Sequence, residues 1–165
     1  MTAKTLTKDD FWDRLKGVQA GMLGAGAARH VPMSHYVEPE TNRLWFITAR
    51  GTDLVEACQT GAEASYIVAS GDGKLYARIH GRARVETDQA KIDELWNPIA
   101  GAWFEDGKDD PDVRLIRMDL SEAEVWATDG GLRFLYETAK AHLTGTPPDM
   151  GEHGTIRFGP SLSDY

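Results

Sequence analysis

The chain has 165 residues, of which 41% are hydrophobic and 27% are charged, a composition typical of a soluble globular protein and not of a disordered or fibrous one. Its length favours a single domain, which we place over residues 1–150. Eighteen Lys and Arg against 26 Asp and Glu give a net charge of −8, which argues against nucleic acid or an anionic membrane as a partner. No apolar run could cross a bilayer and none resembles a secretory signal, so we expect a cytoplasmic protein.

The first third of the chain combines one helical pattern with several short extended ones. Thr7 precedes two aspartates at the spacing of a helix N-cap, and apolar residues then recur at helical intervals, which predicts a helix over residues 9–19. Interrupting glycines indicate a short strand over residues 22–25, and a period-two pattern predicts a second strand over residues 31–37. A turn containing Pro and Asn then leads into a strand over residues 44–48.

The middle of the chain contains a short helix and a hairpin. Thr52 suits the N-cap of a helix that runs to Gln59. Residues 62–69 read as a strand, and the Ser-Gly-Asp-Gly turn at residues 70–73 joins them to a longer strand over residues 75–85. We expect these two strands to pair with each other.

The last third returns to mixed patterns. Asp88 suits the N-cap of a helix that carries Ile92, Leu95, Trp96 and Ile99 on one face, and residues 113–120 read as a strand. A Gly-rich turn at residues 129–131 precedes a helical pattern over residues 132–143, and residues 151–165 are expected to form a mobile tail with little to pack. Short strands joined mostly by turns predict a mainly β, α+β domain built as a small antiparallel barrel with helices at its ends.

Few residues indicate catalytic or metal chemistry. The single cysteine, Cys58, excludes an intrachain disulfide and suits a reducing compartment. It is either a packed residue of a short helix or a reactive thiol, and the frequent burial of cysteine favours packing. The spacing of His, Cys, Asp and Glu matches no zinc or calcium template, so we expect no metal. No nucleophile motif is present either, and no catalytic residue is assigned.

The corner between the strand at residues 44–48 and the helix that begins at Thr52 is a candidate phosphate site. Backbone N–H groups at a helix start, the positive end of the helix dipole and the Thr52 hydroxyl together suit an anion. Arg50 is the cation within this corner. The alternative is that Thr52 only caps its helix.

The long strand over residues 75–85 carries a row of basic side chains. Alternation places small or apolar residues on one face and the basic ones on the other; the basic residues are Arg78, His80, Arg82 and Arg84. One interpretation is a solvated outer face that is paired with carboxylates of a neighbouring strand or subunit. The other is a basic wall near a dimer seam, which attracts a phosphorylated ligand.

Two blocks of the sequence carry a resemblance to a known family. The first consists of Trp96-Asn97-Pro98, the run from Trp103 to Pro111, and Ala123-Glu124-Val125-Trp126. The second consists of Pro32-Met33, Trp45-Phe46-Ile47-Thr48 and Thr52. Together they resemble the signature of the general stress protein branch of the pyridoxamine phosphate oxidase-like superfamily. The resemblance implies an antiparallel split β-barrel that binds FMN and forms a homodimer.

The resemblance also implies where the flavin lies. The strand with Pro32 and Met33 is expected to run along the isoalloxazine ring, and Thr48 and Thr52 to bind the flavin phosphate. Trp103 is the tryptophan of the signature expected nearest the flavin of the partner subunit; the alternative, which the general role of large aromatic residues favours, is that these tryptophans pack at an interface. With the cations described above, the expected cofactor-binding residues are His30, Val31, Pro32, Met33, Ile47, Thr48, Arg50, Thr52, Arg78, Arg82 and Trp103.

Two positions depart from the family pattern. The family usually has Arg directly before Pro-Met and Lys two residues after the Ser/Thr, whereas this chain has Val31 and Leu54. Losing two hydrogen bonds of roughly 1.5–3 kcal/mol each would weaken phosphate binding by about two to four orders of magnitude. Two functions therefore stay open: a flavin-binding protein with oxidoreductase chemistry, or a flavin-poor, non-catalytic module that binds a ligand or a partner. Visible flavin absorption distinguishes them.

Overall fold

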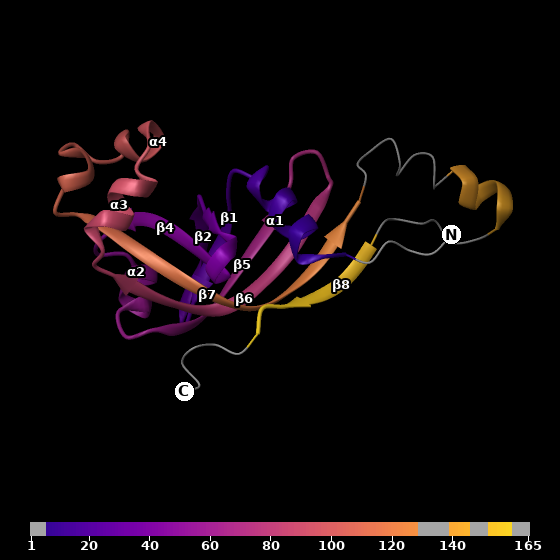
Figure 1. Ribbon diagram of the computed structural model, residues 1–165, viewed down its shortest axis with the longest axis horizontal. Coiled ribbons are helices and arrows are strands. Elements are labelled where there is room, and N and C mark those ends of the chain that lie inside the picture. Colours follow the sequence, from indigo (N-terminus) through magenta and orange to yellow (C-terminus); the bar gives the residue numbers. More distant parts are fainter. Residues whose placement is uncertain (1–5, 129–138, 146–151, 160–165) are drawn as a thin grey trace.

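A computed structural model of the chain describes residues 6–128, 139–145 and 152–159. Over these residues one antiparallel sheet of eight strands curls into a half-barrel (Figure 1). Its order is β2-β1-β5-β6-β7-β4-β3, and β8 pairs with β7 outside this path. The strands are β1 (Gly21–Ala25), β2 (Ala28–Met33), β3 (Tyr36–Glu38), β4 (Arg43–Ala49), β5 (Ala62–Ala69), β6 (Leu75–Glu86), β7 (Val113–Ala127) and β8 (Glu152–Arg157). The prediction of a mainly β, α+β split barrel is confirmed.

Short helices fill the connections between the strands. They are α1 (Lys8–Lys16), α2 (Asp53–Cys58), α3 (Gln89–Leu95) and α4 (Pro98–Gly101), with 3-10 turns η1 (Pro39–Thr41) and η2 (Gly107–Asp109). Three helix starts follow the predicted caps, because the side chains of Thr7, Thr52 and Asp88 each accept a backbone N–H from the first turn. The single helix expected from Asp88 to Ile99 is broken into α3 and α4. The strand expected over residues 31–37 is broken into β2 and β3.

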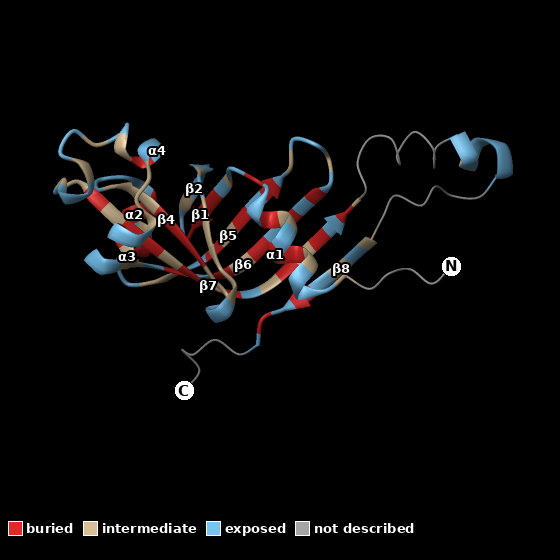
Figure 2. Cartoon of the chain, turned by 45° about the horizontal axis from the view of Figure 1, so that its top comes forward, coloured by how far each residue is buried: buried red, intermediate tan, exposed pale blue. Residues whose placement is uncertain are grey.

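The core lies between the concave side of the sheet and α1. Buried positions alternate with exposed ones along β5 and β6, as the period-two pattern predicts (Figure 2). Phe11 and Leu15 of α1 are fully buried in the same cluster as Phe46 of β4 and Tyr66 of β5. Cys58 at the end of α2 belongs to the same cluster, and burial raises its pKa to about 11. This thiol is therefore a packing group and not a reactive one.

The C-terminal segment differs from the expected mobile tail. Residues 152–157 form β8, which pairs with the second half of β7. Phe158 then packs its ring 5.6 Å from that of Phe11 and 5.8 Å from that of Trp12, and Asn42 donates to its backbone oxygen. Only Ile156 and Phe158 of this segment, residues 152–159, are buried apolar residues. They are enough to order it because the segment also pairs with β7 along its length. The expected turn at residues 129–131 lies outside the described residues, as does the expected helix apart from residues 139–144, which are helical.

His35, in the break between β2 and β3, ties this break to the core. Its Nε2 lies 3.0 Å from the Leu15 carbonyl oxygen, so this nitrogen donates, and its Nδ1 lies 2.6 Å from Tyr66 Oη. Tyr66 Oη also lies 2.9 Å from the Met33 carbonyl oxygen, so its hydroxyl proton is shared between that oxygen and His35 Nδ1. The break is therefore joined to both α1 and β5.

We expect His35 to make stability depend on pH. Burial lowers the pKa of His35 below its ordinary value of 6.5, against the opposing effect of the hydrogen bond to Leu15. Below pH 6.5 the unfolded chain binds a proton that the folded chain resists, so the free energy of unfolding falls as the pH drops through this range. Urea unfolding between pH 8 and pH 5.5 should show the decline in the parent and a shallower one in His35→Gln. Equal slopes would contradict this role.

Candidate functional site

A cavity of about 470 Å³ lies where the end of β2, the start of β3 and β4 meet α4 and the residues after it. In Figure 1, α3 and α4 stand at the same end of the molecule as the start of β7, above β4. The lining residues are Ala20, Pro32, Met33, Ser34, Tyr36, Ile47, Thr48, Ala49, Ile99, Ala100, Trp103 and Phe104. The walls are thus mostly apolar and partly aromatic, with three hydroxyl groups, as is usual for a small-molecule site.

Asn97 positions the short helix α4 over this cavity. Its Oδ1 accepts the backbone N–H of Ala100 at 2.9 Å, which caps α4, and Pro98 occupies the first turn, where no N–H is needed. Its Nδ2 donates to Tyr36 Oη at 2.7 Å. Burial raises the pKa of Tyr36, opposed by the Asn97 bond, so the hydroxyl stays protonated at neutral pH. The Asn97 side chain therefore caps α4 and also joins it by a hydrogen bond to Tyr36 in the cavity wall.

Glu38 and Lys91 hold α3, which precedes α4, against the sheet. Lys91 Nζ lies 2.7 Å from Glu38 Oε2 and 5.1 Å from the centre of the Trp45 ring, and Trp45 Nε1 donates to the same carboxylate at 3.0 Å. Burial alone would raise the pKa of Glu38, but hydrogen bonds from Lys91, Thr41 and Trp45 outweigh it and keep the pKa below its usual value. The carboxylate therefore remains charged and holds α3 against the sheet. Helix α4, which follows α3 and covers the cavity, is thereby kept in place.

The structure brings together five of the residues that the sequence assigned to a cofactor. They are Pro32, Met33, Ile47, Thr48 and Trp103, and all of them line the cavity. Met33 also packs against the main core, and Ile47 against a second cluster beneath α3. Trp103 remains 81% exposed. These residues come from three separate segments, which only the folded sheet and its cover place around one space.

His30 and Val31 lie on β2 outside the cavity lining. The His30 ring sits directly over Gly24, where an added Cβ would lie 2.7 Å from Nδ1, and its Nε2 is 2.6 Å from Ser65 Oγ. Val31 is 39% exposed on this edge strand. The structure thus packs His30 against β1 and β5 and leaves Val31 partly exposed, and neither residue lines the cavity.

The corner after β4 has its polar groups occupied by neighbours. The Thr52 hydroxyl accepts the Val55 N–H at 3.2 Å, which caps α2, and Arg50 Nε lies 2.6 Å from Asp112 Oδ1. Leu54, where the resemblance leads one to expect Lys, is only 3% exposed and belongs to the hydrophobic core. The position is therefore a packing site in this chain.

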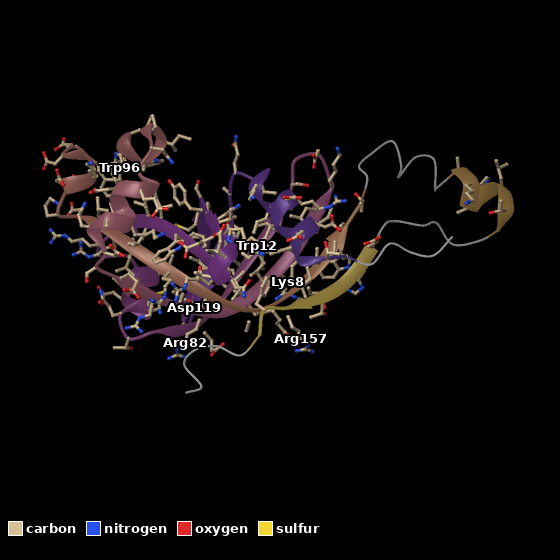
Figure 3. All side chains as sticks on the ribbon, viewed as in Figure 1. Lys8, Trp12, Arg82, Trp96, Asp119 and Arg157 are labelled. Carbon is tan, nitrogen blue, oxygen red and sulfur yellow. The ribbon has the colours of Figure 1, made fainter. Side chains whose placement is uncertain are left out.

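The basic row of β6 lies on the outer face of the sheet beside carboxylates. Arg78 is 2.7 Å from Glu124 of β7, and Arg82 is 3.7 Å from Glu63 of β5. Figure 3 shows Arg82 well away from Trp96, which marks the end of α3. Within this chain the two arginines are therefore paired with carboxylates of neighbouring strands, as the first of the two interpretations expects.

The sequence reasoning missed two polar residues of the site, Tyr36 and Asn97. Asn followed by Pro is a helix-start signal that would have predicted α4. No local signal would have linked Asn97 to a tyrosine 61 residues away. Within the described ranges no group of three or more His, Cys, Asp or Glu could hold a metal ion, and no helix is long and apolar enough to cross a membrane.

An antiparallel split barrel with an apolar cavity beneath a short helical cover defines a class of small-molecule-binding β proteins. Residues 7–149 match the family model described as "Pyridoxamine 5'-phosphate oxidase like". The chain therefore belongs to the pyridoxamine 5'-phosphate oxidase-like family, and the resemblance drawn from the sequence is confirmed.

Solved structures agree with this assignment. The chain is 44% identical to a general stress protein 26 from Jannaschia sp. CCS1, with a TM-score of 0.81 and coverage of 90% of this chain and 96% of that one. It is 32% identical to the general stress FMN/FAD binding protein from Xanthomonas citri, with a TM-score of 0.68 and coverage of 75% and 90%. No curated protein matches the chain. The similarity is thus to the general stress branch of the family.

Proposed function

We propose that the chain binds a flavin, with the isoalloxazine ring in the cavity beneath α4. The observation that carries the proposal is that five residues assigned to the flavin from the sequence line this one cavity. The relative from Xanthomonas citri is described as an FMN/FAD binding protein, which supports the same ligand class here.

The dimensions and chemistry of the cavity fit the ring. Its volume of about 470 Å³ falls within the range of about 300–1,000 Å³ that is usual for cofactor sites. Met33 offers a polarizable surface, and Trp103 and Tyr36 offer aromatic ones. The hydroxyls of Ser34 and Thr48 are available to the polar edge of the ring. A bound flavin would supply hydride or electron transfer, while this chain would bind and orient it; we accordingly propose a flavin-dependent oxidoreductase of the cytoplasm.

The test is the visible absorption spectrum of the purified protein after incubation with excess flavin and gel filtration. We expect flavin absorption to elute with the protein. The second candidate, a flavin-poor binding module, rests on Val31 and on the buried Leu54. A protein that remains colourless and leaves the fluorescence of added flavin unchanged would support that module and contradict our proposal.

We expect Trp103→Ala to weaken flavin binding by about 2–10-fold, since an aromatic contact contributes about 0.5–1.5 kcal/mol. Its side chain is 81% exposed, so stability should change little. Trp126→Ala is the matched control, because Trp126 stacks on His153 at 4.8 Å across β7 and β8 and does not line the cavity. Fluorescence titration of both variants checks this. Equal losses in the two would show that Trp103 does not contact the flavin.

We further propose a homodimer. Ile99 is 72% exposed and Trp103 81% exposed, and both line the cavity from its cover. A second copy that packs over this cover would bury both side chains and close the site. Light scattering at micromolar concentration should give about twice the mass of 18.2 kDa. A monomer at every concentration tested would contradict the shared site.

A further inference from the structure

The side chains around the cavity carry no charge that would suit a phosphate. Among the described residues that line it, none is Lys, Arg, His, Asp or Glu, and the polar side chains are the hydroxyls of Ser34, Tyr36 and Thr48. The Tyr36 hydroxyl already accepts from Asn97. A phosphate taken into this space would lose its water without gaining a cation from the residues that line it, which is costly.

The two cations beside Thr48 already contact oxygen atoms of the protein. Arg114, opposite Thr48 in the ladder of β4 and β7, donates to the carbonyl oxygens of Pro111 at 2.8 Å and of Val113 at 2.9 Å. Arg50 lies 2.6 Å from the Asp112 carboxylate. A phosphate at Arg50 would therefore meet the negative charge of Asp112.

The start of α2 is itself acidic. Asp53 and Glu56 lie in its first turn, and the Thr52 hydroxyl is used to cap Val55. These carboxylates place negative charge where a helix start would otherwise attract an anion. Leu54, between them, is buried and offers no polar group. Helix α2 thus repels a phosphate at the corner that the resemblance assigns to it.

We infer that the cavity recognises the uncharged flavin ring, and that riboflavin and FMN bind to this chain with similar affinity. The inference rests on the proposed function and narrows it: the ligand class is a neutral, planar heterocycle, and the phosphate of FMN stays in solvent. Affinity should accordingly depend little on ionic strength, since no ion pair forms on binding.

Titration of the purified full-length protein with lumichrome, riboflavin and FMN, at low and high salt, tests the inference. One charge-assisted hydrogen bond to the phosphate would favour FMN by about tenfold or more. We expect riboflavin and FMN dissociation constants within about fivefold of each other, with little change on adding salt. FMN binding that is tighter by more than this would overturn the inference and leave the proposed function intact. Binding of none of the three would overturn both.

Arg50→Gln sharpens the test, with Arg82→Gln as the matched control. Both arginines are exposed and ion-paired, so neither change should cost much stability. We expect both variants to bind FMN and riboflavin as the parent does. A loss of FMN affinity of about tenfold in Arg50→Gln alone, with riboflavin unaffected, would show a phosphate at Arg50 and overturn the inference.

Discussion

Leu54→Lys is expected to lower the free energy of unfolding by about 3–5 kcal/mol, even though the family pattern has lysine at this position. Leu54 is 3% exposed within the main hydrophobic cluster. Removing a buried leucine side chain costs about 2–5 kcal/mol by itself, and the cluster that surrounds it consists of hydrophobic side chains, among which an ammonium group would be poorly solvated. Urea denaturation of the purified variant measures the loss.

Two controls separate burial from the loss of a family residue. Leu54→Met keeps the volume and should cost less than about 1.5 kcal/mol. Val31→Arg, at the other departing position, adds a charge to a side chain that is 39% exposed on an edge strand, and should change stability by about 0.5 kcal/mol or less. If Leu54→Lys were as stable as the parent, position 54 of α2 could accept a cation. A phosphate site at the start of α2 would then be open again.

Gly81→Ala is expected to destabilise the protein by about 3 kcal/mol. The register of β6 and β7 shifts between His80 and Gly81, and a Cβ on Gly81 would lie 2.2 Å from the Asp119 carbonyl oxygen. Because that neighbour is backbone in a long paired strand, it cannot rotate aside as a side chain would. Thermal or urea unfolding checks the size of the effect.

Gly154→Ala in β8 is the control for this prediction. Apart from its neighbours along the chain, no atom of the described residues lies within 4 Å of a Cβ built there, so the same methyl group should change stability by no more than about 0.5 kcal/mol. A similar loss in both variants would mean that the Gly81 effect comes from strand propensity and not from the close approach of β6 to β7.

The strands were predictable where their sequence alternates and where the partner strand is close along the chain. The hairpin of β5 and β6 has both features, and its bounds follow the sequence closely. Strand β8 has neither, because its partner β7 lies far earlier in the chain and only Ile156 is buried within it. The break at His35 was also hidden, since bonds to Leu15 and Tyr66 stabilise it through tertiary structure.

The site was predictable only in part. The family signature led to Pro32, Met33 and Thr48, which line the cavity. The contact of Asn97 with Tyr36 depends on how α4 folds back over the sheet, which no local pattern encodes. The partners of Arg50 and Arg82 were likewise invisible in sequence, because each pairs with a carboxylate on another segment of the fold.

A crystal structure of the protein grown with riboflavin tests the central claim most directly. Our account predicts the isoalloxazine ring in the cavity beneath α4, in contact with Met33 and Trp103 and with a hydroxyl of Ser34 or Thr48 at its polar edge. A ring bound elsewhere, such as on the outer face of β6 beside Arg78, with the cavity empty of ligand, would contradict it.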